Sequence, residues 1–159
     1  MLNEDYKEIL QSLVEENVRF ILVGAYALAA HGYPRATMDI DIWVMPSPDN
    51  ADAVIRALNK FGAPLHGLTS NDLQKLDTIF QIGVAPRRID IITSASGLDF
   101  ESAFAKSIPI EIEGIRLNIL SLDDLISNKK ASGRSKDIAD VEALENLRLF
   151  EQEHKSDCS

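Results

Sequence analysis

V-G-A-Y-A-L-A-A-H-G-Y-P-R-A-T-M-D-I-D-I-W-V, residues 23–44, is the stretch on which the fold of this chain depends. The residues just before it, R-F-I-L-V at 19–23, predict a buried strand. A Gly-Ala pair then turns the chain into a short helix, expected over Tyr26–His31, which a Gly-Tyr-Pro triplet ends. A second strand is expected to begin near Thr37. The stretch therefore predicts a strand, a helix and a strand in succession.

The second strand carries acidic residues on one of its faces. Residues 40, 42 and 44 are apolar and point to one side, so Asp39, Asp41 and Trp43 point to the other. Aspartate is depleted in strands, and two on one face need a reason. Residues i and i+2 lie roughly 6.6 Å apart, so a divalent metal ion can bind between the carboxylates and remove their repulsion. The alternation predicts a metal site, with solvated carboxylates on an exposed sheet face as the alternative.

A third acidic residue lies within a later apolar run. Residues 78–84 and 88–93 predict two strands, and the short connection between them favours an antiparallel hairpin. Ile89 and Ile91 are expected to face the core, so Asp90 faces the other way. Carboxylates on rigid strands can hold two Mg²⁺ ions about 3.5–4 Å apart, the arrangement used for in-line nucleotidyl displacement. The candidate catalytic residues and metal ligands are therefore Asp39, Asp41 and Asp90.

Composition limits the class of protein. The chain has 159 residues, 45% of them apolar, which suits one globular domain over residues 1–150 and a polar, disordered tail over 151–159. No apolar run approaches the roughly eighteen residues that a membrane span requires. The N-terminus, M-L-N-E-D-Y-K-E, lacks the layout of a signal peptide. We therefore expect a cytoplasmic protein that does not associate with membranes.

The metal-binding residue types favour a hard ion. The single cysteine, Cys158, excludes an internal disulfide, and the three histidines are scattered without ligand spacing. Oxygen ligands alone point to Mg²⁺. The net charge of −9 argues against a broad nucleic-acid-binding face, although residues 129–136, K-K-A-S-G-R-S-K, form one basic segment.

The remaining pattern predicts an α+β fold, in which helices flank a mixed β-sheet and two helices end the chain. Asn3 and Ser121 are expected to cap helices, and Ser47 or Pro48 is expected to start another. A small hairpin is expected around Glu113-Gly114. The expected helices cover residues 4–16, 48–61, 71–76, 121–130 and 135–150, and the small hairpin pairs residues 110–112 with 116–120.

These motifs resemble those of a known family. V-G-A, a gap, D-I-D-I and a later I-D-I strand resemble the nucleotidyltransferase fold shared with DNA polymerase beta. The longer string G-A-Y-A-L-A-A-H-G-Y-P-R-A-T-M-D-I-D-I is closer still to the small nucleotidyltransferases of the AbiEii toxin-like group. Those proteins also carry a late Lys/Arg-rich segment with an R-x-K-D-type motif. The residues that match this segment are Lys129, Lys130, Arg134, Lys136, Asp137 and Asp140.

The resemblance implies roles for particular residues. Asp39 and Asp41 would ligate two Mg²⁺ ions, and Asp90 would complete one site and help to activate the acceptor hydroxyl. Ala25 departs from the usual Gly-Gly or Gly-Ser turn, so a hydroxyl contact to phosphate is absent while backbone contacts stay available. Arg35 and Thr37 precede the acidic strand and can touch a nucleotide, with a surface salt bridge as the alternative for Arg35. The expected nucleotide-binding set is Gly24, Ala25, Arg35, Thr37, Lys129, Lys130, Lys136 and Asp137.

Two functional hypotheses follow. The first is Mg²⁺-dependent transfer of a nucleoside monophosphate from a nucleoside triphosphate to a hydroxyl of an RNA end, a protein or a small molecule. In this hypothesis the chain can act as a toxin on transfer RNA, with an antitoxin as partner. Because no separate acceptor-binding domain follows residue 150, loops, a partner or a second copy in a homodimer would choose the substrate. The second hypothesis is a catalytically weak or inactive nucleotide-binding module that acts as a sensor or complex partner.

Overall fold

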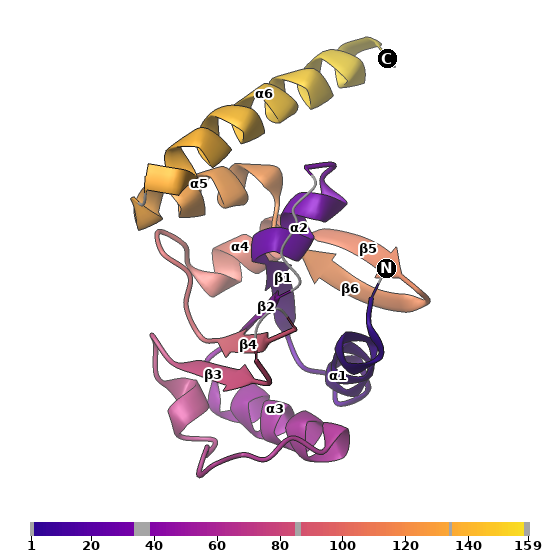
Figure 1. Cartoon of the computed structure of the whole chain (residues 1–159), viewed down its shortest axis with the longest axis vertical. Coiled ribbons are helices and arrows are strands. Elements are labelled where there is room, and N and C mark those ends of the chain that lie inside the picture. The colour runs from indigo at the N-terminus through magenta and orange to yellow at the C-terminus, as the bar shows by residue number, and fades with distance from the viewer. Residues whose placement is uncertain (1, 34–38, 85–86, 134, 158–159) are drawn as a thin grey trace.

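Six strands form one mixed sheet at the centre of the molecule (Figure 1). The computed structural model describes residues 2–33, 39–84, 87–133 and 135–157. The strand order across the sheet is β3-β4-β2-β1-β6-β5. The strands are β1 (Phe20–Val23), β2 (Ile40–Val44), β3 (Ile79–Ile82), β4 (Ile89–Ile92), β5 (Ile108–Ile112) and β6 (Ile115–Ile119).

The pairing of the strands makes the sheet mixed. β1 pairs antiparallel with β2 and parallel with β6, and β2 pairs parallel with β4. The two predicted hairpins form as β3–β4 and β5–β6. The turn of the second hairpin uses Glu113 and Gly114, both at positive φ, which matches the right-handed twist of the flanking strands. This mixed sheet, flanked by helices, confirms the predicted α+β fold class.

Helices cover the sheet from several directions (Figure 1). Asn3 caps α1 by accepting a hydrogen bond from the Tyr6 backbone N–H at 2.8 Å, and Ser47 caps α3. α2 follows β1 directly. α5 and α6 lie at the same end of the molecule as α2, with α6 outermost. The helices are α1 (Glu4–Glu15), α2 (Gly24–Ala30), α3 (Pro48–Phe61), α4 (Phe100–Lys106), α5 (Leu122–Ser132) and α6 (Ser135–Asp157), with a 3₁₀ turn, η1, at Asp72–Gln74.

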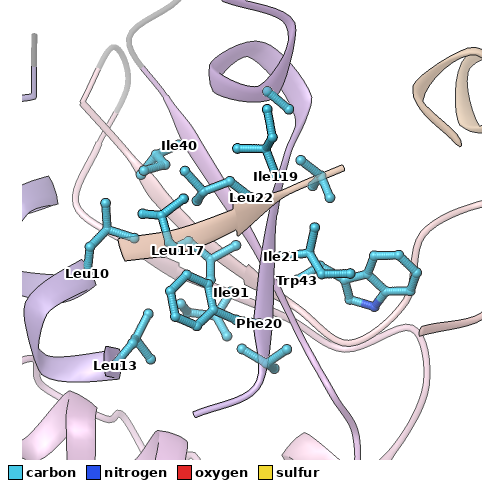
Figure 2. Close-up of a cluster of buried hydrophobic side chains, with 14 of the residues drawn as sticks. Leu10, Leu13, Phe20, Ile21, Leu22, Ile40, Trp43, Ile91, Leu117 and Ile119 are labelled. Atoms are coloured by element: carbon cyan, nitrogen blue, oxygen red, sulfur yellow. The ribbon is translucent and has the colours of Figure 1, made fainter. Parts of the chain in front are cut away.

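The hydrophobic core lies mainly between the sheet and α1 and α3. In Figure 2, Leu10 and Leu13 of α1 belong to one cluster of buried side chains with Ile40, Ile91 and Leu117. Alternation along the strands turns the neighbouring side chains to the opposite face. That face meets α4, where the Trp43 ring packs edge-on against Phe100 with centroids 5.2 Å apart. Both faces of the central strands are therefore packed, and the second face also carries Asp41 and Asp90.

Several boundaries differ from the sequence prediction. β2 begins at Ile40, so Asp39 lies just before the strand, and the predicted start near Thr37 falls outside the described residues. α2 starts at Gly24 because the glycine adopts positive φ and joins β1 directly to the helix. The predicted helix over 71–76 shortens to the single turn η1. α6 continues to Asp157 through residues predicted to be a tail. Among the described residues, no helix is long and apolar enough to cross a membrane.

Asn50 joins α3 to both central strands. Its side-chain oxygen accepts a hydrogen bond from the Arg19 backbone N–H at 2.7 Å. Its amide nitrogen donates to the Arg19 and Met45 backbone oxygens at 3.0 and 2.9 Å. The side chain is 7% exposed, so these bonds replace water at the entry to β1 and the exit from β2.

We predict that Asn50→Ala lowers the free energy of unfolding by about 2 kcal/mol, because three backbone groups lose their partner together. Asn59→Ala removes the same side chain from an exposed position on α3 and should change stability by less than about 0.5 kcal/mol. Urea unfolding measures both values. Equal losses in the two variants would contradict a joining role for Asn50.

Candidate active site

Two of the predicted carboxylates face each other across neighbouring strands. Asp41 of β2 and Asp90 of β4 are register partners in the parallel pair, so their side chains leave the same face of the sheet. This is the face opposite Ile40, Ile42 and Ile91, which are buried in the core. Asp90 itself is only 7% exposed. Strand register therefore forces two acidic groups together in a place with little water.

Gly24 provides the space that Asp41 occupies. It has a φ of +65° at the junction of β1 and α2. A Cβ atom at this position would overlap the Asp41 Oδ2 atom and would lie 3.2 Å from Asp41 Cγ. Glycine is required here for two reasons. Other residues rarely adopt this backbone conformation, and any side chain would displace the carboxylate.

Arg88 connects the remaining acidic residue to this pair. Its Nε and Nη2 atoms donate to the two Asp90 carboxylate oxygens at 2.8 and 3.1 Å. Nη2 also lies 3.5 Å from Asp39 Oδ2, and the Arg88 backbone N–H donates to Asp39 Oδ1 at 3.0 Å. Asp39, Asp41 and Asp90 thus form one electrostatic cluster with the Arg88 guanidinium among them.

The environment of Asp41 disfavours its ionised form. Burial is the largest effect that raises its pKa from the usual 3.8 to about 6. The charge of Asp90, a hydrogen bond between the two carboxyls and the charge of Asp39 raise the pKa further, while Arg88 lowers it. Three ionised carboxylates and one guanidinium would leave two negative charges in this cluster, which a divalent cation can neutralise.

The three acids are of the residue type that binds a hard metal ion. All three acidic side chains supply oxygen ligands, the type that Mg²⁺ prefers, and the missing side chain of Gly24 leaves one Asp41 oxygen uncovered by a Cβ. Among the described residues, however, no group of three or more His, Cys, Asp or Glu side chains is placed so that it could hold a metal ion directly. The guanidinium of Arg88 lies between Asp39 and Asp90 instead. Magnesium binding stays a prediction.

The predicted basic residues lie on α5 and α6. Lys129 Nζ lies 3.2 Å from Asp140 Oδ2, and both side chains are largely buried, at 13% and 7% exposed. The Tyr33 hydroxyl donates to the other Asp140 oxygen at 3.4 Å. Lys130 pairs with Glu145 at 2.8 Å near the surface. These contacts join the helices to each other and, through Tyr33, to the segment after α2.

The other predicted nucleotide-binding residues are described only in part. Ala25 lies in the first turn of α2, next to Gly24. Arg35 and Thr37 lie outside the described residues, and the side chains of Lys136 and Asp137 are also outside them. Their contacts with a nucleotide stay predictions.

The sequence-based prediction missed Arg88 as a member of the site. The signal was present, because Arg88 and Asp90 stand two residues apart and residues with this spacing share one face of a strand. Tyr6 was also missed. Its hydroxyl donates to the Arg88 backbone oxygen at 3.3 Å, and burial raises the Tyr6 pKa to about 12. No local pattern links Tyr6 to a residue 82 positions away.

A mixed sheet that sets paired carboxylates beside a glycine turn defines a protein of the nucleotidyltransferase class. A family model described as "Nucleotidyltransferase of unknown function (DUF6036)" matches residues 1–151. The chain belongs to this family and is a nucleotidyltransferase. No curated protein matches it.

Solved structures share the fold. A Thermotoga maritima protein, TM1012, described as a candidate nucleotidyltransferase, is 18% identical with a TM-score of 0.56, and 96% of each chain is covered. The antibiotic-resistance factor ANT(2'')-Ia is 16% identical with a TM-score of 0.56, covering 97% of this chain and 92% of its own. At these identities the likeness concerns the fold. Membership of the AbiEii toxin-like group stays a prediction.

We predict that Gly24→Ala destabilises the chain more than Gly62→Ala does. Both glycines have positive φ, but a Cβ at Gly62 meets nothing within 4 Å, whereas one at Gly24 meets Asp41. Gly62→Ala should cost about 1 kcal/mol for its backbone conformation, and Gly24→Ala should cost at least about 1 kcal/mol more. Urea unfolding tests the difference, and equal costs would mean that Asp41 moves away without consequence.

We also predict that Asp41→Asn stabilises the metal-free protein at high pH. The folded chain binds the Asp41 proton more tightly than the unfolded chain, so this group contributes stability below a pH of about 4. That contribution is lost as the pH rises through about 6. Asparagine stays neutral, so the variant should gain about 2 kcal/mol over the wild type at pH 8 and lose this advantage near pH 4.

Thermal unfolding in the presence of a chelator measures this pH dependence. Asp52→Asn, at an exposed position on α3, removes the same charge elsewhere and should show no such trend. An advantage of Asp41→Asn that does not change between pH 4 and pH 8 would contradict the raised pKa.

Proposed function

We propose that this nucleotidyltransferase transfers a nucleoside monophosphate from a nucleoside triphosphate to an acceptor hydroxyl in a reaction that depends on Mg²⁺. The observation that carries the proposal is the pair of carboxylates, Asp41 and Asp90, that strand register holds side by side against the Gly24 turn. Such a pair is electrostatically unfavourable by itself. Binding of divalent cations and phosphate at this site would explain why the two carboxylates are held together.

Three residues would hold the metal. Asp39 and Asp41 would contribute oxygen ligands to two Mg²⁺ ions, and Asp90 would complete one of the two positions. Bound there, the ions would lower the pKa of the acceptor hydroxyl and neutralise the triphosphate. The ligands come from the beginning of β2 and from β4. The rigid sheet would therefore define their spacing.

The residues of the chain would orient the two substrates and accept a proton. The acceptor oxygen forms a bond to the α-phosphorus while the bond from that phosphorus to the bridging oxygen breaks, which releases pyrophosphate. Asp90 would help to take the proton that the acceptor hydroxyl loses. The backbone N–H groups of Gly24 and Ala25, at the start of α2, would contact the phosphates.

Several classes of acceptor are compatible with this reaction. Candidates are an RNA end, a protein hydroxyl and a small molecule. More specifically, we propose that the chain is a toxin that modifies transfer RNA. The sequence resemblance to the AbiEii toxin-like group supports this role. Growth arrest on expression that disappears in Asp41→Asn, together with rescue by a neighbouring small antitoxin gene, tests that role. An intact growth rate on expression of the wild-type chain would refute it.

A nucleotide-binding module without turnover is the second candidate. The missing hydroxyl at Ala25 favours it, because one common side-chain contact to phosphate is absent. The two candidates differ in a simple measurement. An enzyme releases pyrophosphate when acceptor is present, whereas a sensor binds the triphosphate and leaves it intact.

We predict that Asp41→Asn and Asp90→Asn each lower nucleotidyl transfer at least about a hundredfold, because neutral amides bind Mg²⁺ poorly. The assay incubates the full chain with α-labelled nucleoside triphosphates, Mg²⁺ and each acceptor class, and follows the label and pyrophosphate. Loss of activity in Asp41→Asn cannot be attributed to unfolding, because this variant is expected to be the more stable protein at pH 8.

Asp52→Asn serves as the matched control and should keep wild-type activity, because Asp52 is exposed on α3. Transfer that survives in both Asp41→Asn and Asp90→Asn would refute the assignment of the site. Tight triphosphate binding without pyrophosphate release in the wild type would favour the binding module.

A further inference from the structure

The guanidinium of Arg88 lies between Asp39 and Asp90, two of the three carboxylates of the site. It donates to both oxygens of Asp90, at 2.8 and 3.1 Å, in the two-pronged geometry that makes arginine–carboxylate pairs strong. The same group lies 3.5 Å from Asp39 Oδ2. One positive charge therefore bridges two of the three carboxylates.

The backbone of Arg88 is anchored while its side chain reaches the surface. The backbone N–H donates to Asp39, and the backbone oxygen accepts from the Ile40 N–H at 3.0 Å and from the Tyr6 hydroxyl at 3.3 Å. The Arg88 side chain is 32% exposed, compared with 10% for the Asp90 side chain alone. Rotation about the side-chain bonds can therefore move the guanidinium towards solvent without any movement of β4.

A guanidinium and a divalent ion cannot both occupy the space between Asp39 and Asp90. Like charges a few ångströms apart repel strongly in a partly buried cluster. Among the described residues, no group of three His, Cys, Asp or Glu side chains is placed so that it could hold a metal ion. Arg88 is the cation that Asp39 and Asp90 contact in this structure.

We propose that Arg88 is a built-in counter-cation that leaves Asp90 when a divalent metal ion binds, so that metal loading at this site exchanges one cation for another. The inference rests on the proposed metal-dependent function. In the metal-free chain Arg88 compensates the repulsion among Asp39, Asp41 and Asp90. In the loaded chain its guanidinium faces the solvent side of the site.

If Arg88 instead positions Asp90 for the metal, removal of its guanidinium should change the metal affinity in the opposite direction. If the guanidinium only oriented Asp90 for the metal, its removal would weaken metal binding. If it competes with the metal, its removal tightens metal binding and weakens the metal-free fold. The direction of the change in metal affinity therefore separates the two roles.

The test measures binding of Mn²⁺ alone to the full chain, from the loss of the free-ion electron paramagnetic resonance signal. Arg88→Met keeps the length of the side chain without its charge and should bind Mn²⁺ about tenfold more tightly than the wild type. Its melting temperature in a chelator should fall, and saturating Mn²⁺ should raise it more than in the wild type. Arg87→Met, an exposed neighbour, removes the same charge and should change the affinity less than about twofold.

Affinity in Arg88→Met that is unchanged or weaker than in the wild type would overturn the proposal. Should this variant fail to fold, Arg88→Lys keeps the charge but cannot form the two-pronged contact. It should bind Mn²⁺ about threefold more tightly than the wild type, because its hold on Asp90 is weaker, and unchanged binding there would equally overturn the exchange.

The measurement also separates this inference from the proposed function. Metal-dependent transfer by the wild type with no tightening in Arg88→Met would refute the exchange alone. Absence of Mn²⁺ binding in both proteins would refute the exchange, and the transfer assay would then decide on the proposed function independently.

Discussion

The parallel pairing of β2 with β4 is the constraint on which the rest of this site depends. It makes Asp41 and Asp90 register partners, so two carboxylates that repel each other in a partly dry place cannot separate without disrupting the sheet. Burial, and after it the charge of Asp90, raises the pKa of Asp41. The chain tolerates the unfavourable pair because the opposite face of the same strands is closely packed.

That packing explains where the stability of the sheet comes from. Ile40, Ile42, Ile89 and Ile91 alternate with the acidic residues and are buried against the core formed with α1 and α3. Burial of each such side chain contributes about 1.5–3 kcal/mol, enough together to offset the cost of placing acidic groups beside one another. The alternation of strand side chains thus lets one segment stabilise the fold on one face and carry the site on the other.

Charge compensation links the site to its proposed chemistry. Gly24 gives Asp41 its space, Arg88 gives Asp90 and Asp39 a positive partner, and the backbone of Arg88 is itself held by Asp39 and by Tyr6. The single positive charge of Arg88 therefore compensates part of the negative charge of the three acids. A nucleotidyltransferase that binds metal together with a triphosphate needs such a site, negative enough to attract the cation and stable before it arrives.

The sequence by itself determined the strand–helix–strand order, the glycine turn and the positions at which α1 and α3 begin. It also identified Asp39, Asp41 and Asp90 as candidates for the site. These features depend on local periodicity and on residue type. It predicted the fold class and both hairpins for the same reason. Only the tertiary structure decided that Asp41 pairs with Asp90, that Arg88 lies between Asp39 and Asp90, and that Lys129 pairs with buried Asp140. These contacts join residues far apart in the chain, and register and helix packing, which no local pattern encodes, bring them together.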